Sequence, residues 1–457
     1  MFHGLMVVAA AALLCSCASS YALWQAGGGP GPVEGNQAPQ AALSITPSDG
    51  PAPLTVQHDA TASTDPDGTI ERYDWDLDGD GTYETADAGG RPPAYVYDTV
   101  GVYNAGVRVT DDDGATSTAT IEVVATGGDP PVDAPALSVE KWQGGSTAAL
   151  SLTFDDGTPE HWSRGLPMWQ DYGFRVTLGI IAQTFETTPA RLPDLQQAFN
   201  AGHELANHSS THPDFTTLTP EQRRQEVLNC QQLLLDNVVG LNHVDTMIYP
   251  YEQFDETVMT EVGLLGYICA RSGSQGITDY AEINDAWNPP LLHLYSWANL
   301  NTLDMWMWDS VVDGVIADGG WQVEQCHGIG AIGETGVGWS PRPEAEFRAH
   351  YNHIASYGDA LWVAPMGEVA RYVLQRNLAD FLVLDYTDTR FEFIVTDTLN
   401  NEIYDVPLTV SMEVPVGMMN ITVRQGLTPL TVSEGEDMNI LFDVTPGNGT
   451  VVVEYGM

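Results

Sequence analysis

Apolar positions along the chain follow two different periods, which divide it into three folded parts. In residues 39–126 and 378–457, short runs of alternating apolar and polar side chains are separated by Asp, Gly and Pro. Alternation with a period of two predicts strands, and many short strands predict a small β-sandwich in each of these parts. In residues 137–377, apolar runs of strand length alternate with longer stretches of helical period. Alternating strands and helices predict a parallel sheet, either open or closed to a barrel.

The pattern also predicts individual elements in the central part. Its expected strands are 148–154, 174–182, 246–249, 266–269, 321–326 and 360–364. Its expected helices are 192–201, 219–238, 255–264, 303–318, 343–357 and 367–376. The helix 219–238 opens with Thr219-Pro220-Glu221-Gln222, a capping box with Pro at the first helical position. Ligands of parallel sheets bind beyond the C-terminal strand ends, so the chemistry is expected there.

Two short motifs carry side chains suited to metal chemistry. Asp155 and Asp156 end the first central strand, within Thr153-Phe154-Asp155-Asp156-Gly157, and His208 and His212 follow farther along the chain. Because successive strand side chains point to opposite faces, the two carboxylates should point in different directions. One Asp and two His suit a divalent ion that keeps positions open for water and substrate. The other Asp is then free to act as a base, and we expect a metal-dependent hydrolase.

Acidic residues dominate the whole chain. It contains 62 Asp and Glu against 16 Lys and Arg, a formal net charge of −46, and Lys141 is its only lysine. Nucleic-acid phosphates and anionic lipid headgroups would be repelled, so neither is expected as a partner. An acidic, Lys-poor surface suits high salt, where counterions screen self-repulsion, and we prefer this explanation to a specific acidic function.

The first 17 residues predict export. Leu5 to Leu14 form an apolar stretch that is too short to span a bilayer and suits a secretory signal. It ends in Leu14-Cys15-Ser16-Cys17, which resembles the box of bacterial lipoproteins and implies lipidation of Cys17, although His3 is the only basic residue before it. The alternative is an ordinary signal-peptidase cut near residues 18–20. We expect either a cell-envelope lipoprotein, held at the membrane only through Cys17, or a secreted protein.

Three further cysteines, Cys230, Cys269 and Cys326, are widely spaced. An odd number at such spacing does not make a disulfide framework. We expect small buried core residues, although one pair could bridge in an oxidising compartment.

Residues 39–126 resemble a known repeat. Residues 18–38, rich in Gly, Ala, Pro and Asn, predict a flexible tether before it, and residues 127–136 predict a linker after it. The motifs that carry the resemblance to the polycystic kidney disease (PKD) repeat are Asp65-Pro66-Asp67-Gly68, Tyr73-Asp74-Trp75-Asp76, Gly101-Val102-Tyr103 and Val109-Thr110-Asp111-Asp112-Asp113-Gly114. The resemblance implies an immunoglobulin-like β-sandwich.

An acidic turn within this repeat is a candidate calcium site. Asp76, Asp78 and Asp80 copy the first half of an EF-type loop, but the Glu expected at loop position twelve is missing, and Glu84 falls at position nine. The turn either binds Ca²⁺ or is a plain acidic turn.

The central part resembles the polysaccharide deacetylase family, carbohydrate esterase family 4. Thr153-Phe154-Asp155-Asp156-Gly157 matches its first motif, and His208-Ser209-Ser210-Thr211-His212 matches its second. The resemblance implies a deformed (β/α) barrel, with Asp155 as the general base and Asp156, His208 and His212 as ligands of zinc. Cobalt, nickel or iron would also suit this ligand set. Tyr249-Pro250-Tyr251 corresponds to the third motif, which implies that the Tyr251 backbone N–H helps to form an oxyanion hole.

Two positions depart from the family pattern. The family often has an Arg two residues before the Pro of the third motif, where it pairs with the base, and this chain has Ile248 there. Arg271, after the next expected strand, is a candidate substitute; the alternative is that it pairs with a surface carboxylate. The last motif, usually Leu-x-Leu-His, is degraded to Glu324-Gln325-Cys326-His327. The resemblance still implies His327 as the general acid.

The leading hypothesis is an exported, metal-dependent deacetylase that removes N-acetyl or O-acetyl groups from a polysaccharide. The resemblance leaves open which acetylated polysaccharide is its partner. One rival is a non-catalytic carbohydrate-binding or adhesion lipoprotein with a decayed barrel, which the missing Arg and the degraded last motif favour. A second rival is a hydrolase that uses the same metal triad on another ester or amide.

Overall fold

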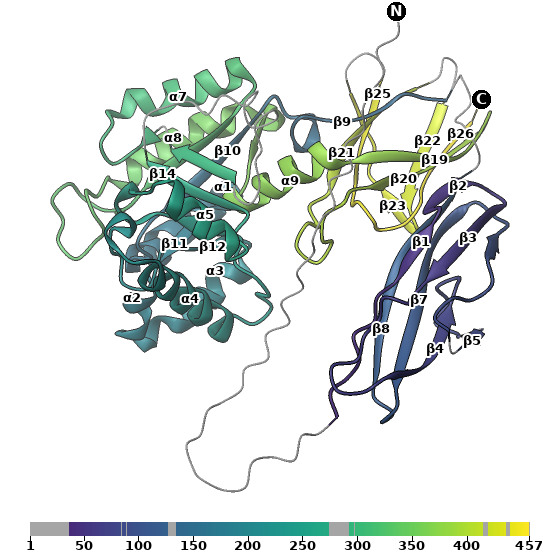
Figure 1. Cartoon of the computed structure of the whole chain (residues 1–457). Helices are drawn as coiled ribbons and strands as arrows, with labels where there is room; N and C mark the ends of the chain where they lie inside the picture. The colour runs from purple at the N-terminus through teal and green to yellow at the C-terminus, as the bar shows by residue number, and fades with distance from the viewer. Residues whose placement is uncertain are drawn as a thin grey trace, which may run out of the picture. The chain divides into compact units, whose positions relative to one another are not determined.

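The computed structural model describes residues 36–83, 85–87, 89–126, 134–273, 292–296, 298–414, 419–435 and 439–456 (Figure 1). The predictions for the signal peptide 1–17 with Cys17, for most of the tether, for Glu84 and for residues 127–133 of the linker lie outside these ranges. None of the helices in the described ranges is both long enough and apolar enough to cross a membrane.

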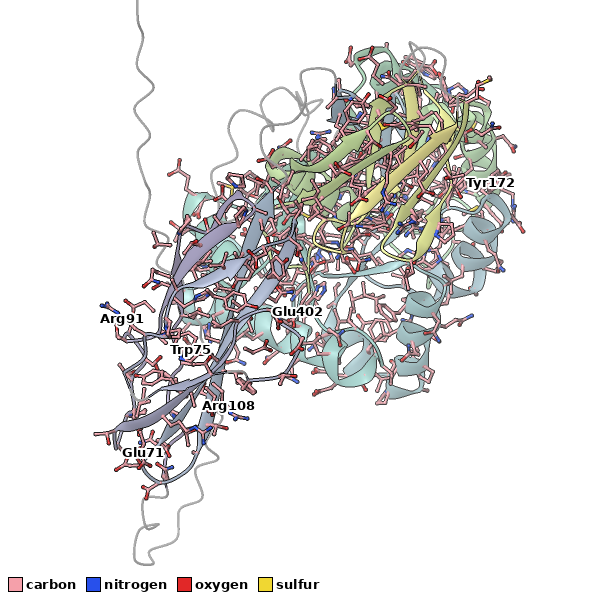
Figure 2. All side chains as sticks on the ribbon, turned by 90° about the vertical axis from the view of Figure 1, so that its right-hand side faces the viewer. Glu71, Trp75, Arg91, Arg108, Tyr172 and Glu402 are labelled. Carbon is pink, nitrogen blue, oxygen red and sulfur yellow. The ribbon has the colours of Figure 1, made fainter. Side chains whose placement is uncertain are left out.

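Residues 36–126 form two β-sheets, as the alternating pattern predicts. One sheet has the order β1 (Ser44–Thr46), β3 (Leu54–Asp59) and β6 (Tyr95–Tyr97). The other has the order β2 (Asp49–Pro51), β8 (Thr116–Thr126), β7 (Gly101–Asp111), β4 (Ile70–Asp76) and β5 (Thr85–Asp87). Trp75 is fully buried with Val107 and Val109 in the core of this domain (Figure 2). The β-sandwich prediction is confirmed.

The acidic turn of this domain follows β4. Asp76, Asp78 and Asp80 bring carboxylate oxygens within 4.8 Å of one another. The same carboxylates accept backbone N–H groups of the turn: Asp76 accepts from Gly79 at 2.8 Å, and Asp80 accepts from Thr82 at 2.7 Å. These bonds are those of an ordinary Asx-type turn, so calcium binding there stays a prediction.

The central part is a curved, wholly parallel sheet that nearly closes to a barrel. The strands along the sheet, in spatial order, are β15 (Leu292–Ser296), β14 (Cys269–Gly273), β13 (Thr246–Ile248), β12 (Glu204–Asn207), β11 (Thr177–Ile180), β10 (Ala148–Phe154), β17 (Trp321–Cys326) and β16 (Ala298–Asn299). β18 (Leu361–Val363) also pairs with β10. Every residue of β10 is buried, as expected for a strand covered on both faces. The predicted parallel α/β barrel is confirmed.

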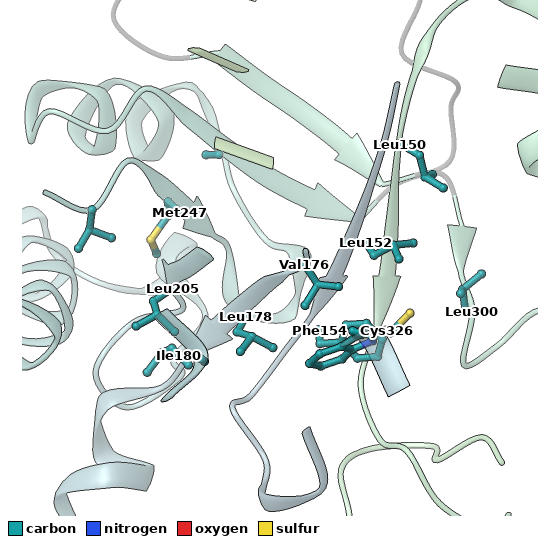
Figure 3. Close-up of a cluster of buried hydrophobic side chains, with 14 of the residues drawn as sticks. Leu150, Leu152, Phe154, Val176, Leu178, Ile180, Leu205, Met247, Leu300 and Cys326 are labelled. Carbon is teal, nitrogen blue, oxygen red and sulfur yellow. The ribbon is translucent and has the colours of Figure 1, made fainter. Parts of the chain in front are cut away.

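Helices cover the outside of this sheet (Figure 1). They are α1 (Leu166–Tyr172), α2 (Ala182–Glu186), α3 (Leu192–Asn200), α4 (Pro220–Asn237), α5 (Glu256–Leu264), α7 (Met305–Asp318), α8 (Glu344–Ser356) and α9 (Met366–Leu378). The predicted capping box starts α4, because the Thr219 side chain accepts from the Gln222 N–H and the Gln222 side chain accepts from the Thr219 N–H. Figure 3 shows the apolar core around Leu152, Phe154 and Leu178.

Residues after α9 form antiparallel sheets. One has the order β19 (Asp380–Thr387), β20 (Arg390–Thr396), β26 (Val451–Gly456), β22 (Met419–Gln425) and β23 (Thr428–Leu430). The other has the order β24 (Ser433–Glu434), β25 (Asn439–Val444), β21 (Leu408–Glu413) and β9 (Leu137–Val139). The small C-terminal β-sandwich is thus confirmed. β9 pairs with β21, although we assigned residues 137–139 to the barrel segment, and Leu137 packs against the C-terminal core.

Candidate functional site

The predicted side chains lie together at the C-terminal ends of the parallel strands. Parallel neighbouring strands end at the same edge of the sheet, so residues at their C-terminal ends are brought close to one another. The residues that line this cavity, of about 310 Å³, are Asp155, Asp156, His208, His212, Tyr249, Tyr251, Glu252, Asn299, Gln325, His327 and Trp339. Arg271 lies behind the cavity in β14 and is 1% exposed. All seven side chains singled out from the sequence therefore meet at one end of the barrel.

Asp156, His208 and His212 converge on one point. Their ligand atoms all lie within 4.8 Å of one another. The two imidazole Nε2 atoms are 3.1 Å apart, and the Asp156 Oδ1 lies 3.6 Å from His208 Nε2 and 3.9 Å from His212 Nε2. The last two distances are too long for hydrogen bonds. Two imidazoles and a carboxylate arranged in this way fit a divalent transition-metal ion.

His208 is held in the tautomer that a metal ligand needs. Its Nδ1 lies 2.8 Å from the carbonyl oxygen of Ile248, which can only accept a hydrogen bond. The proton is therefore on Nδ1, and when the ring is neutral the lone pair of Nε2 points at the convergence point. A backbone carbonyl that fixes the ring of a ligating His is typical of metal sites.

The backbone of this triad is strained. Asp156 and His212 have φ angles of 75° and 61°, and Ser209 between the two His has φ of 68°. Residues other than Gly rarely adopt such angles, and they cluster at functional sites. Hydrogen bonds hold the loop: Ser209 N–H donates to Asn207 Oδ1 at 2.8 Å, and His212 N–H donates to Ser209 Oγ at 2.9 Å. The two His thus converge through a folded loop rather than a helix.

Asp155 is almost completely buried and does not belong to the cluster of ligand atoms formed by the triad. Arg271 Nη2 donates to both of its carboxylate oxygens, at 2.6 and 2.5 Å. Gln325 Nε2 donates to Asp155 Oδ2 at 3.3 Å, and His327 Nε2 lies 3.7 Å from the same oxygen. Burial opposes ionisation, but the charges of Arg271, His327 and His208 outweigh it and hold the pKa of Asp155 below its usual value.

Arg271 reaches Asp155 from a strand that extends farther than predicted. We expected the strand to end at residue 269, but β14 runs from Cys269 to Gly273 and contains Arg271. Its backbone lies opposite Ile248 in the parallel register of β13 and β14. A charged residue can sit inside this buried strand because Asp155 neutralises it. The alternative pairing with a surface carboxylate is wrong.

His327 directly follows β17. Its N–H donates to Asn301 Oδ1 at 2.7 Å, and its carbonyl oxygen accepts from His161 Nε2 at 2.8 Å. His161 is completely buried, and burial is the main reason that its pKa lies below the usual value. A neutral His161 therefore carries its proton on Nε2, toward the His327 carbonyl.

Three residues of this environment escaped the sequence prediction. Asn301 and His161 have no motif or period that marks them, because they act through contacts between distant segments. Gln325 had a signal: it is a polar residue inside a fully buried, otherwise strand-like run. A buried polar group needs a partner, and here the partner is Asp155.

The two imidazoles of the triad have pKa values shifted in opposite directions. Burial opposes protonation of His208, but the carboxylates of Asp156 and Asp155 outweigh it and raise the pKa of His208 above its usual value. Burial, with the charge of His208, lowers the pKa of His212 to about 4, so this ring is neutral near pH 7. Burial opposes ionisation of Asp156, but the neighbouring His208 and the charges of His327 and His212 bring the pKa of Asp156 below its usual value. A neutral imidazole and an ionised carboxylate are the forms that bind a metal.

Tyr251 and the cysteines complete the predicted set. Tyr251 follows β13 with φ of 54°, and its ring lies 4.5 Å from that of His212. Cys230, Cys269 and Cys326 are buried and free, as predicted, and burial raises the pKa of each thiol. Such thiols are inert, so cysteine chemistry does not contribute to this site.

Comparisons with known proteins match two parts of the chain. Residues 144–270 match the family model for polysaccharide deacetylase, and residues 36–125 match that for the PKD domain. The first match contains the triad, Asp155 and Tyr251, and ends just before Arg271.

Among curated proteins, the chain is 27% identical over 336 residues to a gellan lyase from Bacillus sp, which is 69% of this chain and 13% of the relative. It is 30% identical over 117 residues to a bifunctional xylanase/deacetylase from Pseudobutyrivibrio xylanivorans, which is 25% of this chain and 18% of the relative. The chain therefore spans only a small share of the length of these relatives.

Among solved structures, a family 4 acetyl xylan esterase from Clostridium thermocellum, in complex with a cobalt ion, overlaps 50% of this chain and 91% of its own. The identity is 16% and the TM-score 0.35. The two family matches identify the modules that the motifs indicated: the chain carries a polysaccharide deacetylase domain preceded by a PKD domain.

Proposed function

We propose that this chain is a metal-dependent hydrolase that removes acetyl groups from a polysaccharide. One observation carries the proposal: three ligand atoms converge beside a buried carboxylate that is held by an arginine, all facing one cavity. The family match and the similarity to the bifunctional xylanase/deacetylase support the same reaction.

Asp156, His208 and His212 would hold the metal. Zinc is our first choice, and cobalt, nickel or iron would suit the same donors. A divalent ion bound there lowers the pKa of water and polarises a carbonyl group.

Asp155 is placed to act as the general base. It stays ionised because Arg271 and the nearby imidazoles lower its pKa, and its two oxygens are oriented by hydrogen bonds from Arg271 and Gln325. In the proposed step, Asp155 accepts a proton from water while the water oxygen forms a bond to the acetyl carbon. The Tyr251 N–H would stabilise the negative charge that develops on the carbonyl oxygen.

His327 is placed to act as the general acid. Its Nε2 lies 3.7 Å from Asp155, so both groups face the same reacting centre. In the second step, the bond from the acetyl carbon to the sugar nitrogen or oxygen breaks, and His327 donates a proton to that leaving atom. The products are acetate and a free amine or hydroxyl on the sugar.

Arg271 supplies the arginine whose absence from the third motif favoured a decayed enzyme. The arginine that the resemblance places two residues before Pro250 is absent, but Arg271 lies opposite Ile248 on the neighbouring strand. We propose that this substitution across strands restores the orientation of the base. The degraded last motif retains His327 and adds Gln325 as a second donor to Asp155.

The substrate and the compartment belong to the same proposal. An acidic chain favours a neutral polysaccharide over an anionic one, because like charges repel. Acetylated chitin-like and xylan-like chains, with N-acetyl or O-acetyl groups, are the neutral substrates to test, and peptidoglycan, which carries carboxylates, is the anionic one. Export, with or without lipid at Cys17, places the enzyme where such polymers occur.

Acetate release tests this function. The full chain, loaded in turn with zinc, cobalt, nickel and iron, is incubated with acetylated chitooligosaccharide, acetylxylan and peptidoglycan. We expect metal-dependent acetate from at least one polymer, and the Asp155→Asn variant should lose it while still binding zinc. Absence of acetate with every metal and polymer, or equal rates for D155N and wild type, would contradict the proposal. The chain would then be a non-catalytic carbohydrate-binding protein.

A further inference from the structure

A large aromatic side chain stands exposed at the mouth of the catalytic cavity. Trp339 is 54% exposed and lines the cavity together with Asp155 and His327. Exposing the apolar area of a tryptophan to water is unfavourable in free energy. Exposed aromatic side chains beside a cavity therefore often mark a binding site. Trp306 is also exposed, at 69%, but it lines a separate groove along α7. The two residues thus provide a candidate and a matched control.

The backbone that carries Trp339 is held on both sides. The Trp339 carbonyl oxygen accepts from Gly328 N–H at 3.2 Å, and the neighbouring Gly338 N–H donates to the buried carboxylate of Glu160. On the other side, Asn301 Nδ2 donates to the Ser340 carbonyl oxygen at 2.8 Å. The indole is therefore presented from a fixed backbone, and a ligand that binds it need not first order the loop.

The two chain segments lie so close that only glycine fits between them. A Cβ atom on Gly328 would lie 2.6 Å from the Gly338 carbonyl oxygen. Gly328 directly follows His327. The loop that carries Trp339 therefore contacts the backbone next to the proposed general acid. The same contact that excludes a side chain at Gly328 thus fixes the position of the indole relative to His327.

The ring of Trp339 is adjacent to the place of the leaving group. Its centroid lies 5.1 Å from that of His327, with the two planes at 69°. A sugar whose nitrogen or oxygen receives the proton from His327 must lie beside this ring. The C–H bonds of a pyranose form an apolar face with slight positive charge, which suits the negative face of an indole.

We propose that Trp339 stacks on a pyranose ring of the substrate and supplies much of the affinity for the polymer. The ligand class is a neutral pyranose chain, because Glu252 lines the same cavity and the chain carries a net charge of −46, so a carboxylated sugar would be repelled. The inference rests on the proposed function for the position of the sugar. It adds a specificity-determining residue that none of the motifs contains.

The test compares a polymer-like substrate with a small ester. The zinc-loaded full chain is assayed on N-acetylchitotetraose, on acetylated xylotetraose and on 4-nitrophenyl acetate, which has no sugar to stack. For Trp339→Ala we expect KM for the better oligosaccharide to rise by about tenfold with kcat little changed. Trp339→Phe should restore part of the affinity. Activity on the small ester, which has no sugar to stack, should fall much less than activity on the oligosaccharide.

Trp306→Ala is the matched control, and it should stay within about twofold of wild type on every substrate. Far-UV circular dichroism and thermal unfolding show whether each variant is folded. A W339A variant that is folded and keeps the wild-type KM on both oligosaccharides overturns the proposal. Equal losses for W339A and W306A would also overturn it, because they would indicate a general surface effect.

A binding measurement separates this inference from the proposed function. D155N, which is inactive in the proposed mechanism, is titrated with the same two oligosaccharides in a calorimeter, with and without W339A. Binding that W339A weakens supports stacking even if no acetate is ever released. If D155N binds neither oligosaccharide, or binds equally with and without W339A, the stacking proposal is wrong whatever the outcome of the acetate assay.

Discussion

Both ends of the central strands carry carboxylates with little exposure, but the two ends differ in how these carboxylates are hydrogen-bonded. At the N-terminal ends of β12 and β13, Glu204 accepts from Thr246 at 2.9 Å, from Thr177 at 2.7 Å and from the Gly367 N–H at 3.0 Å. Asp245 there is paired through one oxygen with His243 and through the other with Arg371. Each carboxylate oxygen at this end already has a hydrogen-bond partner.

At the C-terminal ends the carboxylates differ from each other. Asp155 is saturated by Arg271 and Gln325, whereas Asp156 lies 3.6 and 3.9 Å from the two imidazoles. Asp156 is half-buried, and the two imidazoles face it at a spacing that suits a shared divalent ion better than direct hydrogen bonds. Low exposure alone therefore does not distinguish a functional carboxylate from a structural one. The distances from the carboxylate to its neighbouring polar groups do.

The largest expected effect comes from removing the carboxylate that lacks close partners. Asp156→Asn should lower zinc affinity and reduce acetate release by more than about a thousandfold, because a metal ligand is lost. The metal-free variant should unfold only slightly below the metal-free wild type, because the attraction between the Asp156 carboxylate and His208, at 3.6 Å, is all that is lost. Calorimetric zinc titration checks the loss of affinity, and thermal unfolding checks the stability of the metal-free variant. Clear destabilisation of the metal-free variant would place Asp156 with the scaffold carboxylates.

The saturated carboxylate of the same site should behave in the opposite way. Arg271→Met leaves the buried Asp155 charge uncompensated and should cost about 3 kcal/mol of unfolding free energy. Acetate release should also fall, by about a hundredfold, as the base loses its orientation. Adding D155N should recover most of the stability and none of the activity. Urea unfolding of the four chains gives the coupling; additive losses would contradict a direct pair.

The scaffold end should lose stability without losing catalysis. Arg371→Met removes a partner of Asp245, whose side chain is 7% exposed, and should cost about 2 kcal/mol. Because Arg371 lies at the opposite strand ends, kcat and KM for acetate release should stay within about twofold of wild type. Urea unfolding and the acetate assay are run side by side. A large fall in kcat would show that the two ends are coupled.

The smallest effect is expected from a third buried cluster, which responds to pH. His350 Nε2 lies 3.0 Å from Glu324 and its Nδ1 lies 2.9 Å from Asp309, with Trp308 and Tyr351 packed around the ring. Burial opposes protonation, but the carboxylates of Glu324 and Asp309 outweigh it and raise the pKa of His350 above its ordinary 6.5. The charged ring therefore stabilises the fold below pH 6.5, and this contribution is lost as pH rises through the folded value.

Unfolding free energy measured from pH 6 to pH 9 checks this direction. The wild type should lose stability across the range more steeply than His350→Gln, which has no proton to lose there. Parallel curves for the two chains would show that His350 does not titrate in this window.

Much of the fold could be predicted because long apolar runs and helical periods are local signals. β10 and β17 have the predicted bounds, and α4 begins at its capping box. β12 was missed because its four residues include Glu204 and Asn207, whose polar side chains break the apolar pattern. β9 was assigned to the barrel segment because nothing in three residues tells which sheet they will join.

The amino-acid sequence by itself determined the class of chemistry. Its motifs contain every donor of the proposed metal site, and they already imply different roles for the adjacent Asp155 and Asp156, which directly follow β10. These assignments could be made from the sequence because the residues of each motif lie close together along the chain.

Only the tertiary structure decided what surrounds Asp155. Arg271, Gln325 and His327 come from strands far apart in the sequence, and their approach depends on the register of parallel strands. The same holds for Trp339, which the buried contacts of Glu160 and Asn301 place at the cavity. Periodicity along one segment carries no information on which distant segment will face it, because that choice is made by packing of the whole barrel.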